Sequence, residues 1–445
     1  MRKAIMLGTV LGVGMAIPLL GERDAWACGG CFVPPAQNVD SQITGERMIF
    51  SISTLQSTLY DEITYSGAPA SFAWVLPIKG KADVGLSADL LFATLDQQTA
   101  STVQEPPTDC PPPPNCQGFY GPASGAAGGS GGNNASTTPA ATVTVISQAQ
   151  VGPYETVQLS STDGSALTSW LTANGYNIPA SDQPALNHYV SEGMDFLALK
   201  LVPGAGVSTM QPVRVTIPGA FPVLPLRMVS VGTGATTGIT LWIVADGRWE
   251  PMNFPFFTIT DSELAWDWNT NSSNFEQLRT SKAAAYNGAG WLIESSIELA
   301  QFSFTQSVAN AQQALQYSAS PTGGYTVPTS TGGGDAGVDG SGDASAGGAN
   351  GDAAESDNAA LLAAAEADVA VLFAGIKGSN ARITRMRGDI AHTALTNDLD
   401  IQASADTAEI SNIYNPALQI GQPLCPIYNS GCEQTGSDGT SYTTW

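Results

Sequence analysis

Two cysteines separated by two glycines, Cys28-Gly29-Gly30-Cys31, are the sharpest candidate for chemistry in this sequence. This spacing suits a redox pair or half of a metal site. A redox pair of the thioredoxin type gains its reactivity from a helix that starts next to it, and Val33-Pro34-Pro35 does not supply that helix directly. We therefore expect a structural disulfide here, with redox work and metal binding as the alternatives.

The other four cysteines also lie close together in pairs along the chain. An even number of cysteines in an exported protein is typical of disulfides. The spacings suggest three local pairs, although six cysteines permit other connectivities. The suggested pairs are Cys28 with Cys31, Cys110 with Cys116, and Cys425 with Cys432.

Histidine chemistry has little support, because His188 and His392 are the only histidines in the chain. A nucleophilic triad or a histidine-rich metal site needs histidine near partners such as Ser, Cys or Asp. No His-Glu-x-x-His motif occurs. We interpret both histidines as ordinary packed or surface residues, and we do not expect a hydrolase that uses histidine.

Carboxylates beside tryptophans form a second candidate, with Asp261, Glu263 and Asp267 next to Trp266 and Trp268. Sugars stack on aromatic rings between acid and base groups in many glycosidases, so the cluster could bind or hydrolyse a glycan. The alternative is a solvated loop whose tryptophans pack into the core. We expect the structural role and keep Trp266, Asp267 and Trp268 as speculative ligand-binding residues.

Three arginines, Arg382, Arg385 and Arg387, stand out because the chain has so few cations. They could bind an anion or a partner, and Arg385 and Arg387 are the speculative site residues. The alternative, which we expect, is pairing with the abundant Asp and Glu side chains.

Asp335, Asp339 and Asp343 recur every fourth residue, whereas calcium loops place their ligands at alternate positions. We expect no metal and no cofactor.

The first 27 residues predict a signal peptide. Arg2 and Lys3 precede an apolar segment, 4–20, and Ala25-Trp26-Ala27 offers a cleavage site before Cys28. The predicted location is the periplasm or the outside of the cell. A lipid-modified Cys28 is the alternative, disfavoured by Trp26 before it and by the odd number of thiols it would leave. No other segment approaches the length of a membrane span.

The charge balance excludes some partners. The 445 residues carry a formal net charge of −23, with 39 acidic and 16 basic side chains apart from histidine. An acidic chain without a basic cluster is repelled by nucleic acid and by anionic lipid. With 43% hydrophobic residues the chain has enough apolar material for one large core or two smaller ones.

Low-complexity segments divide the mature chain. A Pro/Gly/Ser-rich insert at about 111–141 interrupts a main region over 28–317, and an acidic Gly-rich linker follows at 318–356. Such segments have few apolar side chains to bury, so we expect disorder. Beyond the linker we expect a helix and closing segment over 357–413 and a Cys-containing tail over 414–445.

Hydrophobic patterning predicts many strands and a few short helices. The expected strands are 47–53, 59–65, 70–77, 142–148, 156–159, 196–201, 213–217, 226–231, 239–244 and 291–299. The expected helices are 87–98 with Ser87 as its cap, 166–173, 274–286, and one from Asp357 or Asn358 to 373. The short crossovers favour an α+β fold with mainly antiparallel or mixed sheets, several short helices and two disordered Gly/Ser/Ala-rich linkers.

Several blocks, in this order, resemble the exported bacterial DUF2330 family over roughly residues 28–405. They are Cys28-Gly-Gly-Cys-Phe32, Gly45-Glu-Arg47, Phe72-Ala-Trp-Val-Leu-Pro77, Val151-Gly-Pro-Tyr-Glu155, Trp170-Leu-Thr-Ala-Asn-Gly-Tyr176, Phe196-Leu-Ala-Leu-Lys-Leu201, Pro225-Leu-Arg227 and Ile383-Thr-Arg-Met-Arg387. The family has no established activity, so the resemblance supplies no catalytic residues. It implies that the acidic linker is an insertion and that the helix after it folds back onto the main body.

Together these patterns predict an exported, disulfide-stabilised binding or structural module of the cell envelope. Its partner would be an envelope protein or a glycan, and its oligomeric state stays open. The alternative is an extracytoplasmic enzyme with a carboxylate-based or thiol site, for glycan hydrolysis or thiol redox chemistry.

Overall fold

A central eight-stranded sheet organises the chain. The computed structural model describes residues 31–32, 42–66, 73–108, 143–176, 178, 183–205, 210–230, 235–319, 350–423, 427–428, 434–435 and 441–442. From one edge to the other, the strands are β14 (Phe256–Phe257), β17 (Trp291–Glu298), β18 (Ala381–Ala391), β12 (Thr236–Asp246), β2 (Gln42–Ile52), β3 (Gln56–Ser66), β10 (Val213–Pro218) and β5 (Asp83–Leu86). The pairs β2–β12 and β14–β17 are parallel and the other neighbours are antiparallel, so the sheet is mixed.

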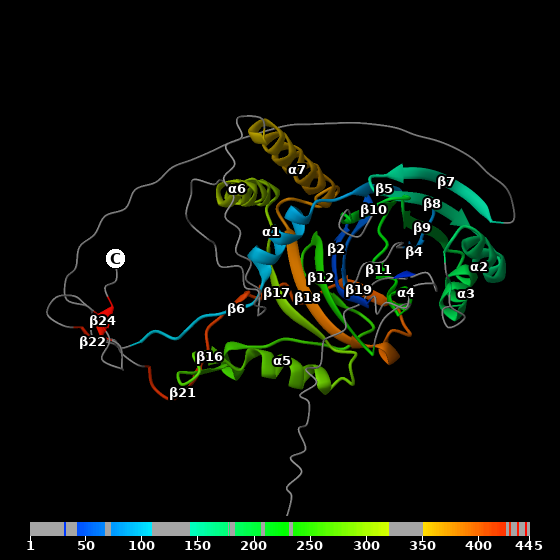
Figure 1. The fold of residues 1–445 in the computed structure, drawn as a ribbon. Coiled ribbons are helices and arrows are strands. Elements are labelled where there is room, and N and C mark those ends of the chain that lie inside the picture. Colours follow the sequence, from blue (N-terminus) through cyan, green and yellow to red (C-terminus); the bar gives the residue numbers. More distant parts are fainter. Residues whose placement is uncertain are drawn as a thin grey trace, which may run out of the picture.

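A second sheet of five strands packs against one face of the first (Figure 1). Its strands, in spatial order, are β1 (Cys31–Phe32), β4 (Ala73–Ile78), β9 (Asp195–Leu201), β8 (Tyr154–Ser160) and β7 (Thr144–Val151). All of its neighbouring strands are antiparallel. The largest apolar core lies between the two sheets.

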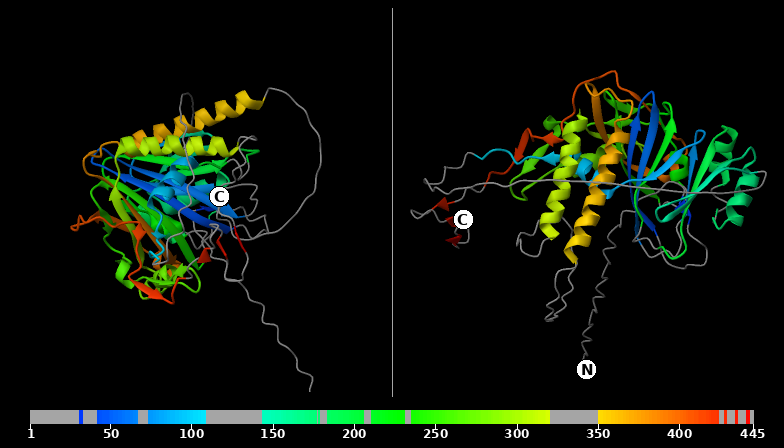
Figure 2. Two further views of the ribbon diagram at one scale, coloured as in Figure 1. Left: turned by 90° about the vertical axis from the view of Figure 1, so that its left-hand side faces the viewer. Right: turned by 90° about the horizontal axis from the view of Figure 1, so that it is seen from above.

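Helices cover the two outer faces. The opposite face of the central sheet carries α1 (Asp89–Thr99), α6 (Gln301–Ala319) and α7 (Asn350–Leu372), and Figure 2 shows α6 and α7 side by side. The outer face of the five-stranded sheet carries α2 (Gly164–Ala173) and α3 (Gln183–Ser191), together with α4 (Leu226–Val229). The main body therefore has four layers, in the order helix, sheet, sheet, helix.

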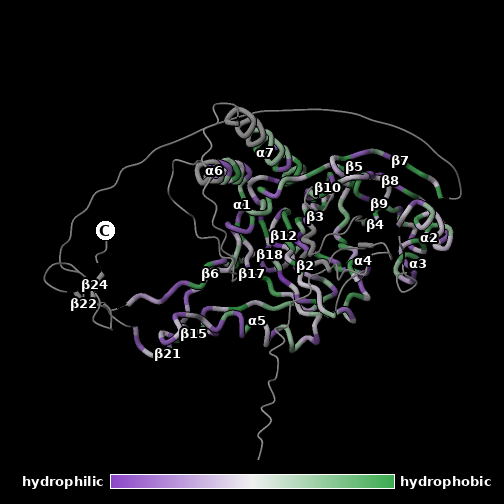
Figure 3. Tube along the Cα trace, in the orientation of Figure 1, coloured by the Kyte–Doolittle hydropathy of each residue, from purple (hydrophilic) through white to green (hydrophobic). Residues whose placement is uncertain are grey.

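The middle strand β12 shows why both layers are needed. Ile239, Leu241 and Ile243 face the five-stranded sheet, whereas Trp242 and Val244 face the helices. Successive side chains of a strand point to opposite faces, so a strand that is apolar at every position must be covered on both. Figure 3 shows hydrophobic residues gathered in the central strands around β12.

Shorter elements complete the fold at the ends of the sheets. They are β11 (Val223–Leu224), β19 (Leu399–Ala403) and β13 (Trp249–Pro251) in one small sheet; β16 (Ser272–Ser273), β15 (Ala265–Asp267) and β21 (Leu418–Ile420) in another; β6 (Thr102–Val103) with β20 (Ile413–Tyr414); and β22 (Ile427–Tyr428), β23 (Gln434–Thr435) and β24 (Ser441–Tyr442). The remaining helical segments are α5 (Phe275–Ala284) and the 3₁₀ turns Asp261–Glu263 and His392–Ala394. No helix in the described part of the chain is both long and apolar enough to cross a membrane.

The predicted fold class is confirmed, because mixed and antiparallel sheets combine with helices. One predicted strand is wrong, since 226–231 begins with the helical turn α4. There Leu226 and Val229 reach the core between the sheets and Met228 reaches the outer core, which a three-residue helical spacing allows. The predicted linker at 318–356 is also too long, because α6 extends to Ala319 and α7 begins at Asn350. The insert at 111–141 lies outside the described residues.

Ser87 does not cap α1 as predicted, because its hydroxyl has another partner. Ala88 occupies the N-cap position without a side-chain cap. The Ser87 hydroxyl donates instead to Oδ2 of Asp368 at 2.5 Å, and Asp368 also accepts from the backbone N–H of Ala88 at 3.2 Å. A carboxylate from α7 thus takes over the role of a local cap, which ties the start of α1 to a helix far away in sequence.

Asp368 is the polar anchor of α7. Its side chain is 1% exposed, and Oδ1 lies 2.5 Å from Nη1 of Arg214 on β10. Tyr60 and Ser51, on β3 and β2, donate to carbonyl oxygens of Asp368 and Leu372 at 3.0 and 2.6 Å. A buried carboxylate is stable only when it is paired in this way, so α7 has one favourable position on the sheet.

We expect Asp368→Ala to lower the free energy of unfolding by about 3 kcal/mol, because Arg214 would lose its partner inside the structure. Glu366→Ala on the exposed side of α7 is the matched control and should change stability by less than about 0.5 kcal/mol. Urea denaturation of both variants measures the difference. Equal stability of the two variants would contradict the anchoring role.

Candidate functional site

The predicted cysteine sites fall almost entirely outside the described residues. Cys31 belongs to β1, whose backbone pairs with Trp74 and Ala73 of β4. The others are Cys28, Cys110, Cys116, Cys425 and Cys432. The three disulfides therefore stay predictions, as do the redox and metal alternatives for Cys28 and Cys31.

The tryptophans of the predicted glycan site are buried. Trp266 and Trp268 are only 8% and 6% exposed, and their rings meet edge to face with centroids 6.2 Å apart. Nε1 of Trp268 donates to Gln419 at 2.9 Å. A sugar needs an open ring face for stacking, and neither ring offers one.

The carboxylates beside these tryptophans serve local contacts. Asp267 accepts hydrogen bonds from the backbone and side chain of Asn269, both at 2.8 Å. Glu263 pairs with Lys282 at 2.5 Å, and this ammonium group lowers the pKa of Glu263. Asp261 accepts from the backbone N–H of Asn415 at 3.0 Å. The three carboxylates therefore accept hydrogen bonds or an ion pair within this loop and its neighbours.

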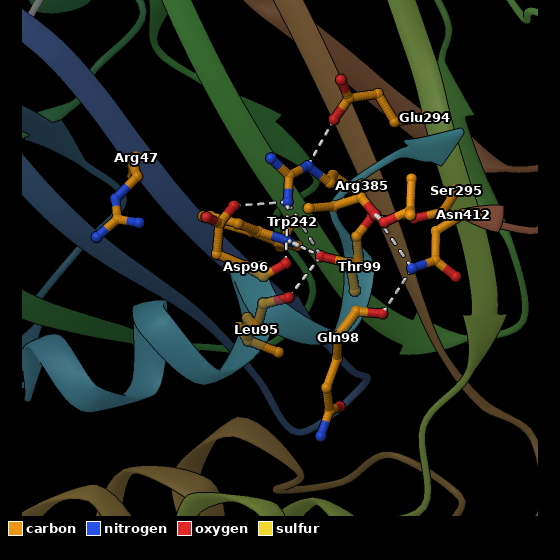
Figure 4. Close-up of polar contacts among 12 residues, drawn as sticks. Arg47, Leu95, Asp96, Gln98, Thr99, Trp242, Glu294, Ser295, Arg385 and Asn412 are labelled. Atoms are coloured by element: carbon orange, nitrogen blue, oxygen red, sulfur yellow. Dashed lines mark hydrogen bonds and ion pairs between the residues drawn. The ribbon is translucent and has the colours of Figure 1, made fainter. Parts of the chain in front are cut away.

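Arg385 lies in a buried network between β18 and α1 (Figure 4). Its guanidinium binds Oε2 of Glu294 at 2.5 Å and Oδ1 of Asp96 at 2.6 Å. It also stacks 5.2 Å from the ring centroid of Trp242, whose Nε1 donates to Thr99 at 2.8 Å. With 8% of its side chain exposed, Arg385 is enclosed by partners of opposite charge, as expected for an ion pair of the core.

Arg387 follows two residues later on β18, half-buried and opposite Leu292 of β17. Alternation along the strand places it on the same face as Arg385. Because Arg385 is neutralised by Glu294 and Asp96, the two arginines do not form a joint anion site of the kind the sequence suggested. The pairing of Arg385 agrees with the alternative of ion pairing.

Sequence reasoning missed an acidic cavity that lies between the two sheets. Asp61 and Glu62 of β3, Trp74 of β4, Asp89 of α1 and Tyr154 of β8 line it, together with the segment 210–213. Its space for water-sized groups is about 50 Å³. Since a buried water needs roughly 10–15 Å³ on this measure, the cavity holds a few waters or one small ligand group.

A pair of carboxyl groups forms the floor of this cavity. Asp61 is 3% exposed and hydrogen-bonds the side chain of Glu46, which is 2% exposed. The register Met48 with Asp61 puts Glu46 of β2 diagonally next to Asp61 on the same face. Burial raises the pKa of Asp61 to about 7. The hydrogen bond with Glu46 lowers this pKa only in part, so Asp61 keeps its proton below about pH 7.

Two further acids lie between this pair of carboxyl groups and the solvent. Asp89 is exposed and Glu62 is half-buried between it and the interior. Burial raises the pKa of Glu62, while its ion pair with Arg47 lowers it. None of the described residues that line the cavity is a lysine, an arginine or a histidine. The lining therefore carries an excess of negative charge, which a low-dielectric wall strengthens.

The lining also contains polar atoms without partners. Oδ1 of Asp61 and Nε1 of Trp74 are buried and form no hydrogen bond with the described residues. Tyr154 is satisfied, because its hydroxyl donates to the carbonyl of Gln211 at 2.8 Å. Buried polar atoms in proteins almost always have a partner, so these two indicate that a ligand or water belongs in the cavity.

The cavity does not resemble a metal site. No group of three or more His, Cys, Asp or Glu side chains with the geometry to hold a metal ion occurs among the described residues.

The sequence carried one signal for the acidic floor. Glu46 precedes Met48 and Phe50, and Asp61 follows Leu59, at positions where alternation calls for an apolar side chain.

We expect Arg385→Met to lower the free energy of unfolding by about 3–5 kcal/mol, because Glu294 would stay buried without a counter-charge. Adding Glu294→Gln should recover part of this loss by removing the unpaired charge. Chemical denaturation of the two variants provides the measurement. A double variant no more stable than the single one would show that packing on Trp242, and not the ion pair, is what matters.

Asp61 should make stability depend on pH. Its pKa rises from 3.8 to about 7 on folding, so its contribution is complete below about pH 4 and is lost as the pH rises through 7. Asp61→Asn cannot ionise, and its stability relative to the wild type should therefore increase between pH 5 and pH 8, on the order of 3 kcal/mol. Urea denaturation at both pH values measures this change. Asp83→Asn, at an exposed position of β5, is the control, and a difference between Asp61→Asn and wild type that stays constant with pH would refute the buried pair.

Comparison with known proteins gives one match. The model of a family described as "Uncharacterized protein conserved in bacteria (DUF2330)" matches residues 23–306, which is more than half of the chain. No curated protein and no solved structure is significantly similar to the chain. The match ends before α7 and β18, so the resemblance in Ile383–Arg387 lies beyond it. The chain belongs to the DUF2330 family.

Proposed function

We propose that the protein is an exported binding module of the cell envelope and that the acidic cavity is its ligand site. The observation that carries this proposal is the unpartnered, buried Oδ1 of Asp61 in the lining of a cavity. The other buried acids discussed above, Asp368 and Glu294, are paired with arginines inside the protein. A preformed recess with convergent polar groups is the general form of a small-ligand site.

The proposed location rests on the sequence. The apolar leader and the cleavage site before Cys28 support export, and six cysteines after that point support an oxidising compartment. The size of the cavity limits what enters it. With about 50 Å³ it accepts a small group of a ligand, whereas a sugar ring or a peptide backbone would stay outside.

An enzyme with a carboxylate-based site is the second candidate. The pKa of Asp61, raised to about 7 by burial, suits a general acid or base that works near neutral pH. However, none of the described residues that line the cavity is Ser, Thr, Cys, His or Lys, so a nucleophile of these types is absent from the described lining. Glycan hydrolysis further requires room for a sugar between the two carboxyl groups, and Glu46 and Asp61 are in direct contact.

A thermal-shift screen of the purified protein tests the proposal. The compounds should be small polar molecules of positive, neutral and negative charge, each at millimolar concentration. We expect some to raise the melting temperature of the wild type and of Asp83→Asn but not of Asp61→Asn. A ligand that binds only the folded state stabilises that state and so raises the melting temperature.

Two outcomes would overturn the proposal. Hits whose effect is the same in Asp61→Asn would place the ligand site elsewhere. Chemical conversion of a hit compound, followed by mass spectrometry and abolished by Asp61→Asn, would favour the enzyme over the binding module.

A further inference from the structure

We propose that the acidic cavity binds a short primary alcohol, whose hydroxyl group joins Asp61 of β3 to Trp74 of β4. This inference rests on the proposed function, because it takes the cavity as the ligand site. It adds the chemical class of the ligand and names the two protein atoms that recognise it.

Two buried polar atoms of complementary type occur in the lining of this cavity. Oδ1 of Asp61 and Nε1 of Trp74 form no hydrogen bond with the described residues, although Asp61 is only 3% exposed and Trp74 only 1%. An indole N–H can only donate a hydrogen bond, whereas a carboxylate oxygen can only accept one. Buried polar atoms almost always have a partner, so the group that enters the cavity should satisfy both.

The two atoms belong to facing walls. Asp61 lies in the central sheet, Trp74 lies in the five-stranded sheet, and the cavity is between these sheets. Backbones of facing sheets are about 10 Å apart, so one small group can contact side chains of both. The hydroxyl of Tyr154 is already satisfied, because it donates to the carbonyl of Gln211 at 2.8 Å and accepts from the N–H of Gln211 at 3.0 Å.

A hydroxyl group matches this pair of atoms. Its oxygen accepts from the N–H of Trp74, and its O–H donates to Oδ1 of Asp61. If Oδ1 itself carries a proton, the second lone pair of the hydroxyl oxygen accepts that proton, so the match does not depend on the charge of Asp61. Both contacts are hydrogen bonds, and no covalent bond forms or breaks.

Other small groups meet only part of this requirement. An ammonium group has no acceptor for the N–H of Trp74, and a carbonyl oxygen has no donor for an ionised Asp61. A carboxylate also lacks a donor, and the acids Glu62 and Asp89 in the lining would repel it.

The apolar part of the lining favours an alcohol over water. Leu199, Met210 and Val213 contribute this surface, which an alkyl chain covers and water does not. Affinity should therefore rise about fourfold for each CH₂ group from methanol to 1-propanol. The space of about 50 Å³ limits the chain to a few carbons.

Nuclear magnetic resonance of the full chain with isotope-labelled tryptophan tests the inference. We expect 1-propanol to move the indole N–H signal of Trp74 in a saturable way, and to give a nuclear Overhauser effect between this proton and the CH₂ protons of the alcohol. So small a ligand should have a dissociation constant in the millimolar range. The signal is identified by its loss in Trp74→Phe or, if that variant does not fold, by through-bond assignment from the Trp74 backbone.

Two other tryptophans are matched controls in the same spectrum. Nε1 of Trp266 and Nε1 of Trp291 are also buried without a partner among the described residues, and neither residue is part of the described lining. Their signals should not respond to 1-propanol. Propylammonium chloride, sodium propionate and acetone have a similar size, and we expect each to bind about tenfold more weakly, because each leaves a buried atom unpaired.

The outcomes separate this inference from the proposed function. Equal responses of Trp74, Trp266 and Trp291 would show a general solvent effect and refute the alcohol site. Tighter binding of propylammonium, propionate or acetone would refute the hydroxyl class, while the cavity would remain a ligand site. If 1-propanol does not bind but a compound of the thermal-shift screen acts through Asp61, only this inference fails. If no compound of either experiment binds in the cavity, water alone fills it and the proposed function fails as well.

Discussion

The pairing of β18 with β12 is the interaction on which the rest of the structure depends. It runs the whole length of β18, from Ala381 to Ala391, and β17 pairs along the other edge of the same strand. Without β18 the central sheet would split into two parts, and β12 would expose an unpaired edge in the middle of the core. The family match over 23–306 thus covers most of the sheet but omits the strand that joins it.

This constraint explains why charged groups lie inside the helical layer. The strands β18 and β10 bring Arg385 and Arg214 to the face that α1 and α7 must cover. Glu294, Asp96 and Asp368 neutralise them there, so the helices dock in one position. Buried ion pairs contribute little net stability, because desolvation offsets their attraction. Their main effect is to destabilise arrangements of α7 in which these charges would be unpaired.

Much of the sheet architecture could be predicted from apolar alternation. The prediction of 196–201 and 239–244 as strands agrees with β9 and β12 within a few residues, since both carry continuous apolar runs. The helix α6 was missed although Phe304 and Val308 have helical spacing, because polar residues dominate its sequence. The acidic floor could not be predicted, because the contact of Glu46 with Asp61 depends on the strand register, and the cavity above it depends on the second sheet.

The acidic cavity can be explained by the small number of basic side chains in this chain. The sequence has 39 acidic and 16 basic side chains, and the described ion pairs use most of the arginines that reach the interior. These are Arg47, Arg214, Arg227, Arg248, Arg279 and Arg385. A buried carboxyl group that no arginine reaches must keep a proton or find a positive charge from outside. Asp61 faces a cavity whose described lining contains the acids Glu62 and Asp89 and no basic side chain, and Asp89 is exposed. The acidic lining of this cavity therefore reflects the same imbalance that makes the whole chain acidic.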